Sequence, residues 1–348
     1  MSFSFVSNDD AATRRAAARC LAALNPGGKP AGQAPLSPWQ TIEASAQVLE
    51  TNALADHAWV VRSRAVNGAP AMASAWPLWF RRDAARYERP LVCLCRIPSV
   101  AGLQGLAAQL RQRGVLCNEA TAWREGGSPE RHAELPLWLA DNLDYVPYDL
   151  ACADEARAVL EGALEDMYDQ GTRRFYYLSA HDLPTPAGTI MDPAMASDAM
   201  RGMYLARATP AGAAITHVRL LAAGTVLHAA LRAARLLWRG WRIGAEVWSC
   251  PSYTRLAREA RQASWHALLH PDAPAEASHL VRCLARGRGP VIAATAYPRR
   301  IAEQIGAHVR GPFMAVGGDS MAIAPQDDPL SSRALALAAI QVLQNTDR

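Results

Sequence analysis

The sequence predicts an α/β protein in which two doubly wound domains follow one another along the chain. Short apolar segments typical of buried strands alternate with segments whose apolar residues recur at helical spacing, and this alternation holds in both halves. Strands that alternate with helices favour mostly parallel sheets, because each helix carries the chain back to the start of the next strand. A chain of 348 residues is long enough to bury two such cores.

The alternation is clearest in the second half of the chain. The expected elements are a strand and a helix within Val218 to Leu237 joined by a Gly224-Thr225 turn, a strand at Ala245 to Cys250, a helix capped by Ser252, a strand at Gly289 to Tyr297, a helix at Arg300 to Val309 and a further strand in FMAVGGD. Serine ahead of a helical pattern is a preferred N-cap. This half therefore predicts a parallel sheet by itself.

The first half repeats the alternation less regularly. After an Ala/Arg-rich helix (ATRRAAARCLAALN) and a Gly/Pro-rich linker, the expected elements are a helix in IEASAQVLETNALADHAW, a strand at Pro90 to Ile97, a helix at Leu103 to Arg113, a strand in GVLCNE and, after Tyr148-Asp149, a long helix. We predict an arm at 1–37, a first domain at 38–190, a linker at 191–212 and a second domain at 213–348. The segment LPTPAGTIMDP, with three prolines and one glycine, suits a crossing loop.

Composition excludes several classes of protein. The formal charge of +4 is spread over scattered arginines, which predicts no nucleic-acid partner. No run of about 18 apolar residues is present, so we expect no membrane span. The N-terminus lacks a secretory signal, and seven scattered cysteines suit a reducing cytosol, which predicts a cytoplasmic location. Cys93 and Cys95 alternate along an apolar strand and are expected in the core rather than on a metal.

Several phrases carry a more specific signal. LLAAGTVLHAAL, WSCPSYTRLARE, Trp265 followed by LLHP, ATAYPRRIAEQI and VGGD occur in this order in the second half. Together they resemble the C-terminal domain of the homodimeric, bacterial-type pyruvate dehydrogenase decarboxylating component, a thiamine diphosphate enzyme of the transketolase superfamily. Met167-Tyr168 and Tyr176-Tyr177 match that family's middle domain more sparsely. The resemblance implies a pyrimidine-binding-like domain followed by a transketolase C-terminal-like domain.

The same resemblance implies a partner chain. The family's N-terminal domain holds the cofactor's diphosphate through Mg²⁺, with a Gly-Asp-Gly start and a later asparagine. Gly318-Asp319-Ser320 with Asn345 imitates this pattern, but it lies in the part that matches the C-terminal domain, and we reject it. We therefore expect a beta-type subunit that pairs with an alpha-type subunit in a heterotetramer. Thiamine diphosphate would be shared between the chains and Mg²⁺ held on the partner, with no metal site in this chain.

In that family a glutamate hydrogen-bonds the aminopyrimidine ring and starts the proton relay of the cofactor. It lies in a segment similar to ile-asn-glu-ala-gly-ala, about eighteen residues before a gly-val-pro turn. Glu50 stands at this spacing before Gly68-Ala69-Pro70 and is our candidate, with Glu43 as the fallback. The other interpretation of Glu50 is an ordinary solvated helix residue, since glutamate is a strong helix former.

Further site residues follow from the same resemblance. The aminopyrimidine needs an aromatic platform, for which Trp79 or Phe80 in SAWPLWF is the candidate; a core role is the alternative. His132 and His181 are candidates for the acid–base histidines of 2-oxo acid chemistry. Met191-Asp192 stand where one family histidine would precede the pro-ala-met phrase. The histidines of the second domain are expected to be structural.

The predicted function is thus the beta-type half of a thiamine diphosphate enzyme. It would decarboxylate a 2-oxo acid such as pyruvate and transfer the two-carbon unit to a lipoyl group or another acceptor. Two alternatives belong to other classes of protein. In the first alternative the chain is a non-catalytic scaffold or regulatory subunit that keeps the fold. In the second it is a binding module for another nucleotide or anion at the same sheet edge.

Overall fold

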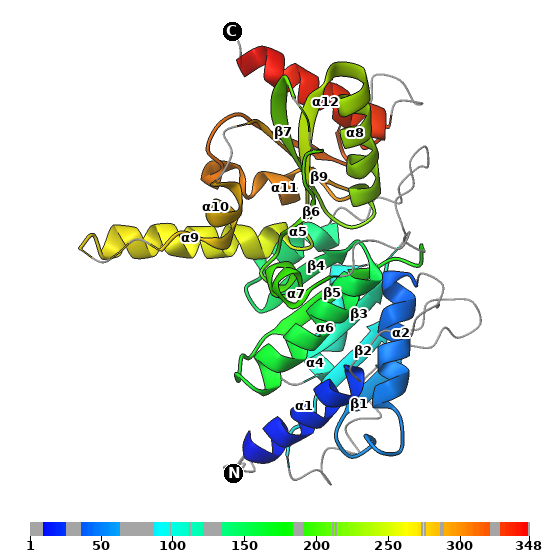
Figure 1. The fold of residues 1–348 in the computed structure, drawn as a ribbon. Helices are drawn as coiled ribbons and strands as arrows, with labels where there is room; N and C mark the ends of the chain where they lie inside the picture. The colour runs from blue at the N-terminus through cyan, green and yellow to red at the C-terminus, as the bar shows by residue number, and fades with distance from the viewer. Residues whose placement is uncertain are drawn as a thin grey trace.

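The computed structural model describes residues 10–25, 36–62, 87–97, 99–110, 113–120, 134–183, 191–210, 212, 214–272, 274, 276–285, 289–320 and 328–346. Within these residues the strands form two separate five-stranded sheets. The first described helix, Asp10–Leu24, lies at one end of the molecule and the last, Ser332–Thr346, at the other (Figure 1). The two-domain α/β fold predicted from the sequence is confirmed.

The first sheet has the order β1-β2-β3-β5-β4, and every neighbouring pair is parallel. Its elements in chain order are α1 (Asp10–Leu24), α2 (Pro38–Leu49), β1 (Trp59–Arg62), β2 (Leu91–Cys95), α4 (Val100–Gln109), β3 (Gly114–Glu119), α5 (Glu134–Asp141), β4 (Tyr145–Leu150), α6 (Ala153–Tyr168) and β5 (Phe175–Ala180). Helices α1, α2 and α6 cover one face and α4 and α5 the other. Both faces of the sheet are therefore buried, as parallel sheets require.

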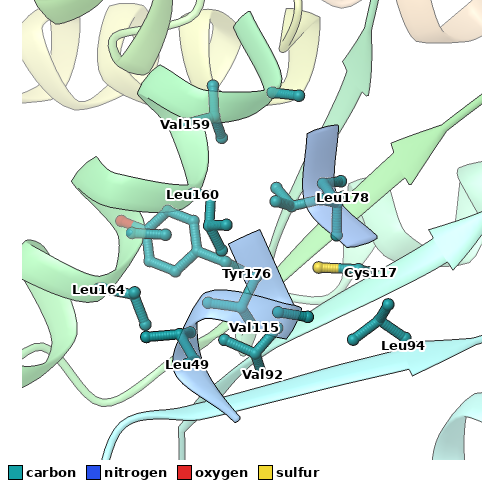
Figure 2. Close-up of a cluster of buried hydrophobic side chains, with 14 of the residues drawn as sticks. Leu49, Val92, Leu94, Val115, Cys117, Val159, Leu160, Leu164, Tyr176 and Leu178 are labelled. Atoms are coloured by element: carbon teal, nitrogen blue, oxygen red, sulfur yellow. The ribbon is translucent and has the colours of Figure 1, made fainter. Parts of the chain in front are cut away.

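The core of the first domain shows why its strands are continuous apolar runs. All five residues of β2 are buried, and alternate ones point to opposite faces. Val92 and Leu94 pack with Leu49, Leu160 and other side chains of the α2–α6 face (Figure 2). Cys93 and Cys95 pack on the α4–α5 face, which confirms them as core residues.

The second sheet has the order β10-β9-β7-β8-β6. Its elements are α7 (Pro193–Met200), β6 (Tyr204–Arg207), β7 (Thr216–Ala222), α8 (Val226–Trp241), β8 (Ile243–Ser249), α9 (Tyr253–Leu269), α10 (His279–Leu284), β9 (Val291–Thr295), α11 (Arg300–Glu303), a short 3₁₀ helix η1 (Gly306–His308), β10 (Phe313–Gly317) and α12 (Ser332–Thr346). Helices α8 and α12 cover one face, and α9, α10 and α11 the other. Only β6 is antiparallel to its neighbour, β8.

Three local predictions differ from the structure. The helix expected at Arg300 to Val309 ends at Glu303 and is followed by the short 3₁₀ helix η1. The helix expected in IEASAQVLETNALADHAW ends at Leu49, and Trp59 already begins β1, whose side chains alternate between buried and half-buried. The range 191–212, predicted as a linker, contains α7 and β6. Asp192 caps α7 by accepting a hydrogen bond from the Met195 amide at 2.8 Å, so the aspartate and the proline after it start a helix rather than prolong a loop.

The two domains are joined where β4 ends. The Ser252 hydroxyl donates to the carbonyl of Pro147 at 2.6 Å, and the Asp149 amide donates to the carbonyl of Pro251 at 2.7 Å. Ser252 also accepts from the Arg255 amide, which confirms it as the N-cap of α9. The cap of one domain's helix is thus bonded to the backbone of the other domain's strand.

Candidate functional site

The carboxyl ends of β4 and β5 face the start of α8 in the second domain. In open parallel sheets, ligands bind outside the carboxyl ends of the strands. The Gly224 amide, in the turn before α8, donates to the Asp149 carbonyl at 3.2 Å. This junction is where ionisable side chains of both domains meet, and it is the candidate functional site.

Asp149 packs directly against the Gly224 turn. Gly224 has φ +52°, and a Cβ placed on it would lie 2.4 Å from one carboxylate oxygen of Asp149. Only glycine combines this left-handed backbone with so close an approach. Desolvation by burial, and to a lesser extent the charge of Glu155, raises the pKa of Asp149 to about 7. Asp149 can therefore hold or release a proton near neutral pH.

Glu155, in the first turn of α6, is fully buried and joins the two domains. Its carboxylate accepts from the Ala151 amide at 2.6 Å, from the Tyr204 hydroxyl at 2.9 Å and from the Ser249 hydroxyl. Tyr204 and Ser249 belong to β6 and β8 of the second sheet. Burial raises the pKa of Glu155, and the three donors act in the opposite direction.

His181 follows β5 and is 4% exposed. Its Nδ1 accepts from the Leu183 amide at 3.1 Å, whereas its Nε2 is buried without a hydrogen-bond partner in the described part of the chain. Burial first, and then the charge of His228, lower the pKa of His181 to about 4. His228 on α8 has a lowered pKa and a buried, unpartnered Nε2 as well. Both rings are neutral at pH 7.

Glu50 lies elsewhere. It is the C-cap residue of α2, and its carboxylate accepts three hydrogen bonds from the Arg62 guanidinium, at 3.0 to 3.2 Å. The side chains of Glu50 and Arg62 are 40% and 31% exposed. The other end of α2 meets His181, whose carbonyl accepts from the Trp39 amide. A helix of 12 residues, about 18 Å long, therefore separates Glu50 from His181. Glu50 as the aminopyrimidine contact remains a prediction.

The remaining predicted residues have different positions. His132, Trp79, Phe80 and the Gly68-Ala69-Pro70 turn lie outside the described residues. Glu43 lies on α2, 4.0 Å from Arg62. Asp319, in the rejected Gly-Asp-Ser phrase, accepts a hydrogen bond from the Arg299 amide at 2.6 Å. Among the described residues, no three His, Cys, Asp or Glu side chains are grouped so that they could hold a metal ion.

Sequence reasoning missed Asp149 and Glu155 as site residues. Asp149 enters the sequence predictions only in the Tyr148-Asp149 pair before a helix, and Glu155 does not enter them. The available signal for Asp149 was an acidic residue near the end of an apolar strand, where side chains can face a ligand. Their pairing with Gly224, Tyr204 and Ser249 depends on contacts between the two domains, which no local pattern contains.

Known proteins match most of this chain. Residues 202–318 match the transketolase-like C-terminal domain family. Pyruvate dehydrogenase E1 components are similar in sequence: that of Cupriavidus necator is 32% identical over 64% of this chain, and that of Mycolicibacterium smegmatis 33% over 67%. The chain spans about a quarter of the length of these relatives, 25% and 26%.

Solved structures show the same fold over most of the chain. A split-gene transketolase, described as an inactive beta4 tetramer, has a TM-score of 0.57 at 14% identity and covers 90% of this chain and 99% of its own. The transketolase of Campylobacter jejuni has a TM-score of 0.59 and covers 94% of this chain and 50% of its own. The solved structures, at 12–14% identity, show a shared fold. By its sequence matches the chain contains, at residues 202–318, a transketolase-like C-terminal domain.

Proposed function

We propose that the chain is a beta-type subunit of a thiamine diphosphate-dependent assembly that acts on a 2-oxo acid such as pyruvate. The observation that carries the proposal is the end-to-end match with a split-gene transketolase chain, combined with sequence relatives that are pyruvate dehydrogenase E1 components. An alpha-type partner would supply the Mg²⁺–diphosphate half, and a lipoyl group or another acceptor would take the two-carbon unit. A cytoplasmic location is part of the proposal. None of the helices in the described residues is long and apolar enough to cross a membrane.

An exposed apolar helix end supports association with another subunit. Helix α9 extends away from the body of the protein (Figure 1). Near its C-terminus Trp265, Leu268 and Leu269 are 61%, 68% and 67% exposed. Large apolar side chains grouped in this way on a projecting helix are typical of an interface. We assign this end of α9 to the contact with the partner subunit.

The residues around Glu50 do not fit an aminopyrimidine ring as they stand. A carboxylate that tunes the ring needs a free oxygen and a sheltered position, whereas the Glu50 carboxylate is occupied by Arg62 and is 40% exposed. With Arg62 bound to it, Glu50 is not placed to transfer a proton. In the catalytic version of the proposal the partner subunit would have to displace Arg62.

The second candidate is a non-catalytic scaffold or regulatory subunit that retains the fold. One observation favours it: the Glu50 carboxylate is paired with the Arg62 guanidinium. In this role the chain contributes the α9 surface and the rigid junction between the two domains, and the assembly takes its reactive carboxylate from elsewhere.

Co-purification separates the candidates. The chain would be co-expressed with an alpha-type chain that carries the Gly-Asp-Gly motif, and the complex analysed for bound thiamine diphosphate and for deuterium exchange at the thiazolium carbon. A complex with fast exchange supports the enzyme, and a complex without exchange supports the scaffold. If no complex forms and no cofactor is bound, both candidates are wrong.

The surface assignment has its own test. The triple variant W265S, L268S and L269S should lose the complex in size-exclusion chromatography with light scattering. Leu143→Ser, which changes a 67% exposed leucine in the loop between α5 and β4, should keep it. Equal complex formation by both variants would contradict the assignment of α9.

A further inference from the structure

A hollow on the second domain combines arginines with a tryptophan. It has a volume of about 300 Å³ and is lined by residues of β6, α8 and the loop after β6: Arg207, Pro210, Ala234, Arg235, Trp238 and Arg239. Helix α8 lies on the outside of the second domain (Figure 1). A volume of this size is at the lower end of small-molecule pockets.

The arginines of this hollow are not paired with carboxylates of the described residues. Within the described part of the chain, no carboxylate forms an ion pair with Arg207, Arg235 or Arg239. Helix α8 itself contains no acidic residue. Three guanidinium groups around one hollow attract an anion, and their planar donor pattern matches phosphate and carboxylate oxygens.

A fourth arginine lies over the ring of Trp238, and its backbone has a left-handed conformation. Arg242, the C-cap of α8, has φ +54° and is the only non-glycine residue with positive φ in the described chain. Glycine is the usual residue at such a position, because a side chain is disfavoured there. Here the position places the Arg242 guanidinium over the Trp238 ring, 5.2 Å from its centroid. Strained residues of this kind cluster at functional sites.

The arrangement favours a small ligand over a membrane surface. A basic amphipathic helix binds membranes through its apolar face, but the apolar face of α8 is buried in the core, including Val226, Ala230 and Leu237. The floor of the hollow is made by Ala234 and Pro210, and Trp238 offers an aromatic surface. The tip of the Trp238 ring would lie 3.3 Å from a Cβ at Gly212, so this glycine lets the loop approach the ring.

We propose that this hollow binds a nucleoside monophosphate, that is, a small organic phosphate that carries a flat heteroaromatic ring. Arg207, Arg235 and Arg239 hold the phosphate, and the ring lies against Trp238. The site is in the second domain, away from Glu50 and from the junction at Asp149, and the proposal does not depend on the proposed thiamine diphosphate function.

Calorimetric titration of the full chain with adenosine monophosphate, ribose 5-phosphate and adenosine tests the proposal. Adenosine monophosphate should bind saturably and at least about fivefold more tightly than ribose 5-phosphate, because only the former can stack on Trp238. Arg235→Gln and Arg239→Gln should each weaken it about tenfold or more, since each removes a charge-assisted hydrogen-bond donor. The matched control, Arg300→Gln, changes an exposed arginine of α11 and should leave the affinity unchanged.

Arg242→Gly separates loss of binding from loss of folding. Glycine suits the left-handed backbone, so the melting temperature should not fall, while the affinity for adenosine monophosphate should. Three results would overturn the proposal: no saturable heat with adenosine monophosphate, equal affinities for adenosine monophosphate and ribose 5-phosphate, or an equal loss in Arg235→Gln and in Arg300→Gln. The last result would mean that only the overall positive charge attracts the ligand.

Discussion

Asp149→Asn should change how the stability of the protein depends on pH. In the folded chain the pKa of Asp149 is raised from 3.8 to about 7, first by burial and then by Glu155. Between these two values the folded state holds a proton that the unfolded state has lost. Stability therefore falls as the pH rises through this window. Most of the loss comes between about pH 5 and pH 7.

The expected size follows from the shift. One pKa unit corresponds to about 1.4 kcal/mol, and integrating between about pH 5 and pH 7 gives about 2 kcal/mol for this group. Asp149 as a whole residue is half-buried, so solvent screening reduces the effect to about 1–2 kcal/mol. Asparagine keeps the shape but cannot ionise. The variant should lose the part of the pH dependence of the unfolding free energy that Asp149 causes. At about pH 8 it should be more stable than the wild type by about 1–3 kcal/mol.

The assay is urea unfolding at about pH 5 and about pH 8, with the free energy of unfolding as the quantity compared. Glu155 also has a raised pKa, so some slope will remain in the variant, and the difference between the two proteins is the test. Asp272→Asn, which changes an exposed aspartate after α9, is the matched control and should behave as the wild type. If Asp149→Asn kept the full wild-type slope, the carboxylate at the Gly224 turn would already be ionised in the folded protein, and the reasoning would be wrong.

Three further substitutions test the junction and the predicted carboxylate. Gly224→Ala should lower the free energy of unfolding in urea by about 2–4 kcal/mol, because its Cβ would meet the Asp149 carboxylate in a left-handed backbone. Gly240→Ala, on the open side of α8, should raise it by about 0.5–1 kcal/mol. Equal effects of the two substitutions would contradict this reasoning. Glu155→Ala leaves three buried donors unpaired and should lower the free energy of unfolding by about 3–5 kcal/mol. Glu155→Gln should lower it by about 1 kcal/mol. Similar losses in the two variants would show that these hydrogen bonds do not account for the stability. Glu50→Gln should change stability by less than about 1 kcal/mol, as for an exposed ion pair. In the reconstituted complex it should slow deuterium exchange at the thiazolium carbon by about 10²–10⁴ if Glu50 is the aminopyrimidine contact; unchanged exchange would leave Glu50 a surface residue.

Local signals were enough for much of the fold. GVLCNE was predicted as a strand and forms β3, and the serine before α9 was predicted as its cap and accepts the Arg255 amide. Strand periodicity and N-capping depend on residues close together in the sequence, so they survive whatever the chain packs against. The helix expected up to Trp59 was wrong, because the apolar residues of the β1 region also fit a helical pattern and only pairing with β2 made them a strand.

The sequence by itself determined the alternation of strands and helices, the buried parallel sheets and the superfamily to which the C-terminal part belongs. Tertiary structure alone decided which side chains meet. It made β6 an antiparallel edge strand, paired Glu50 with Arg62, placed Asp149 against Gly224 and gathered the arginines around Trp238. Each of these contacts joins residues from different elements, and most join distant parts of the chain. The energies of these contacts depend on burial and on how closely two backbones approach each other. The pattern of residues along the sequence contains neither quantity.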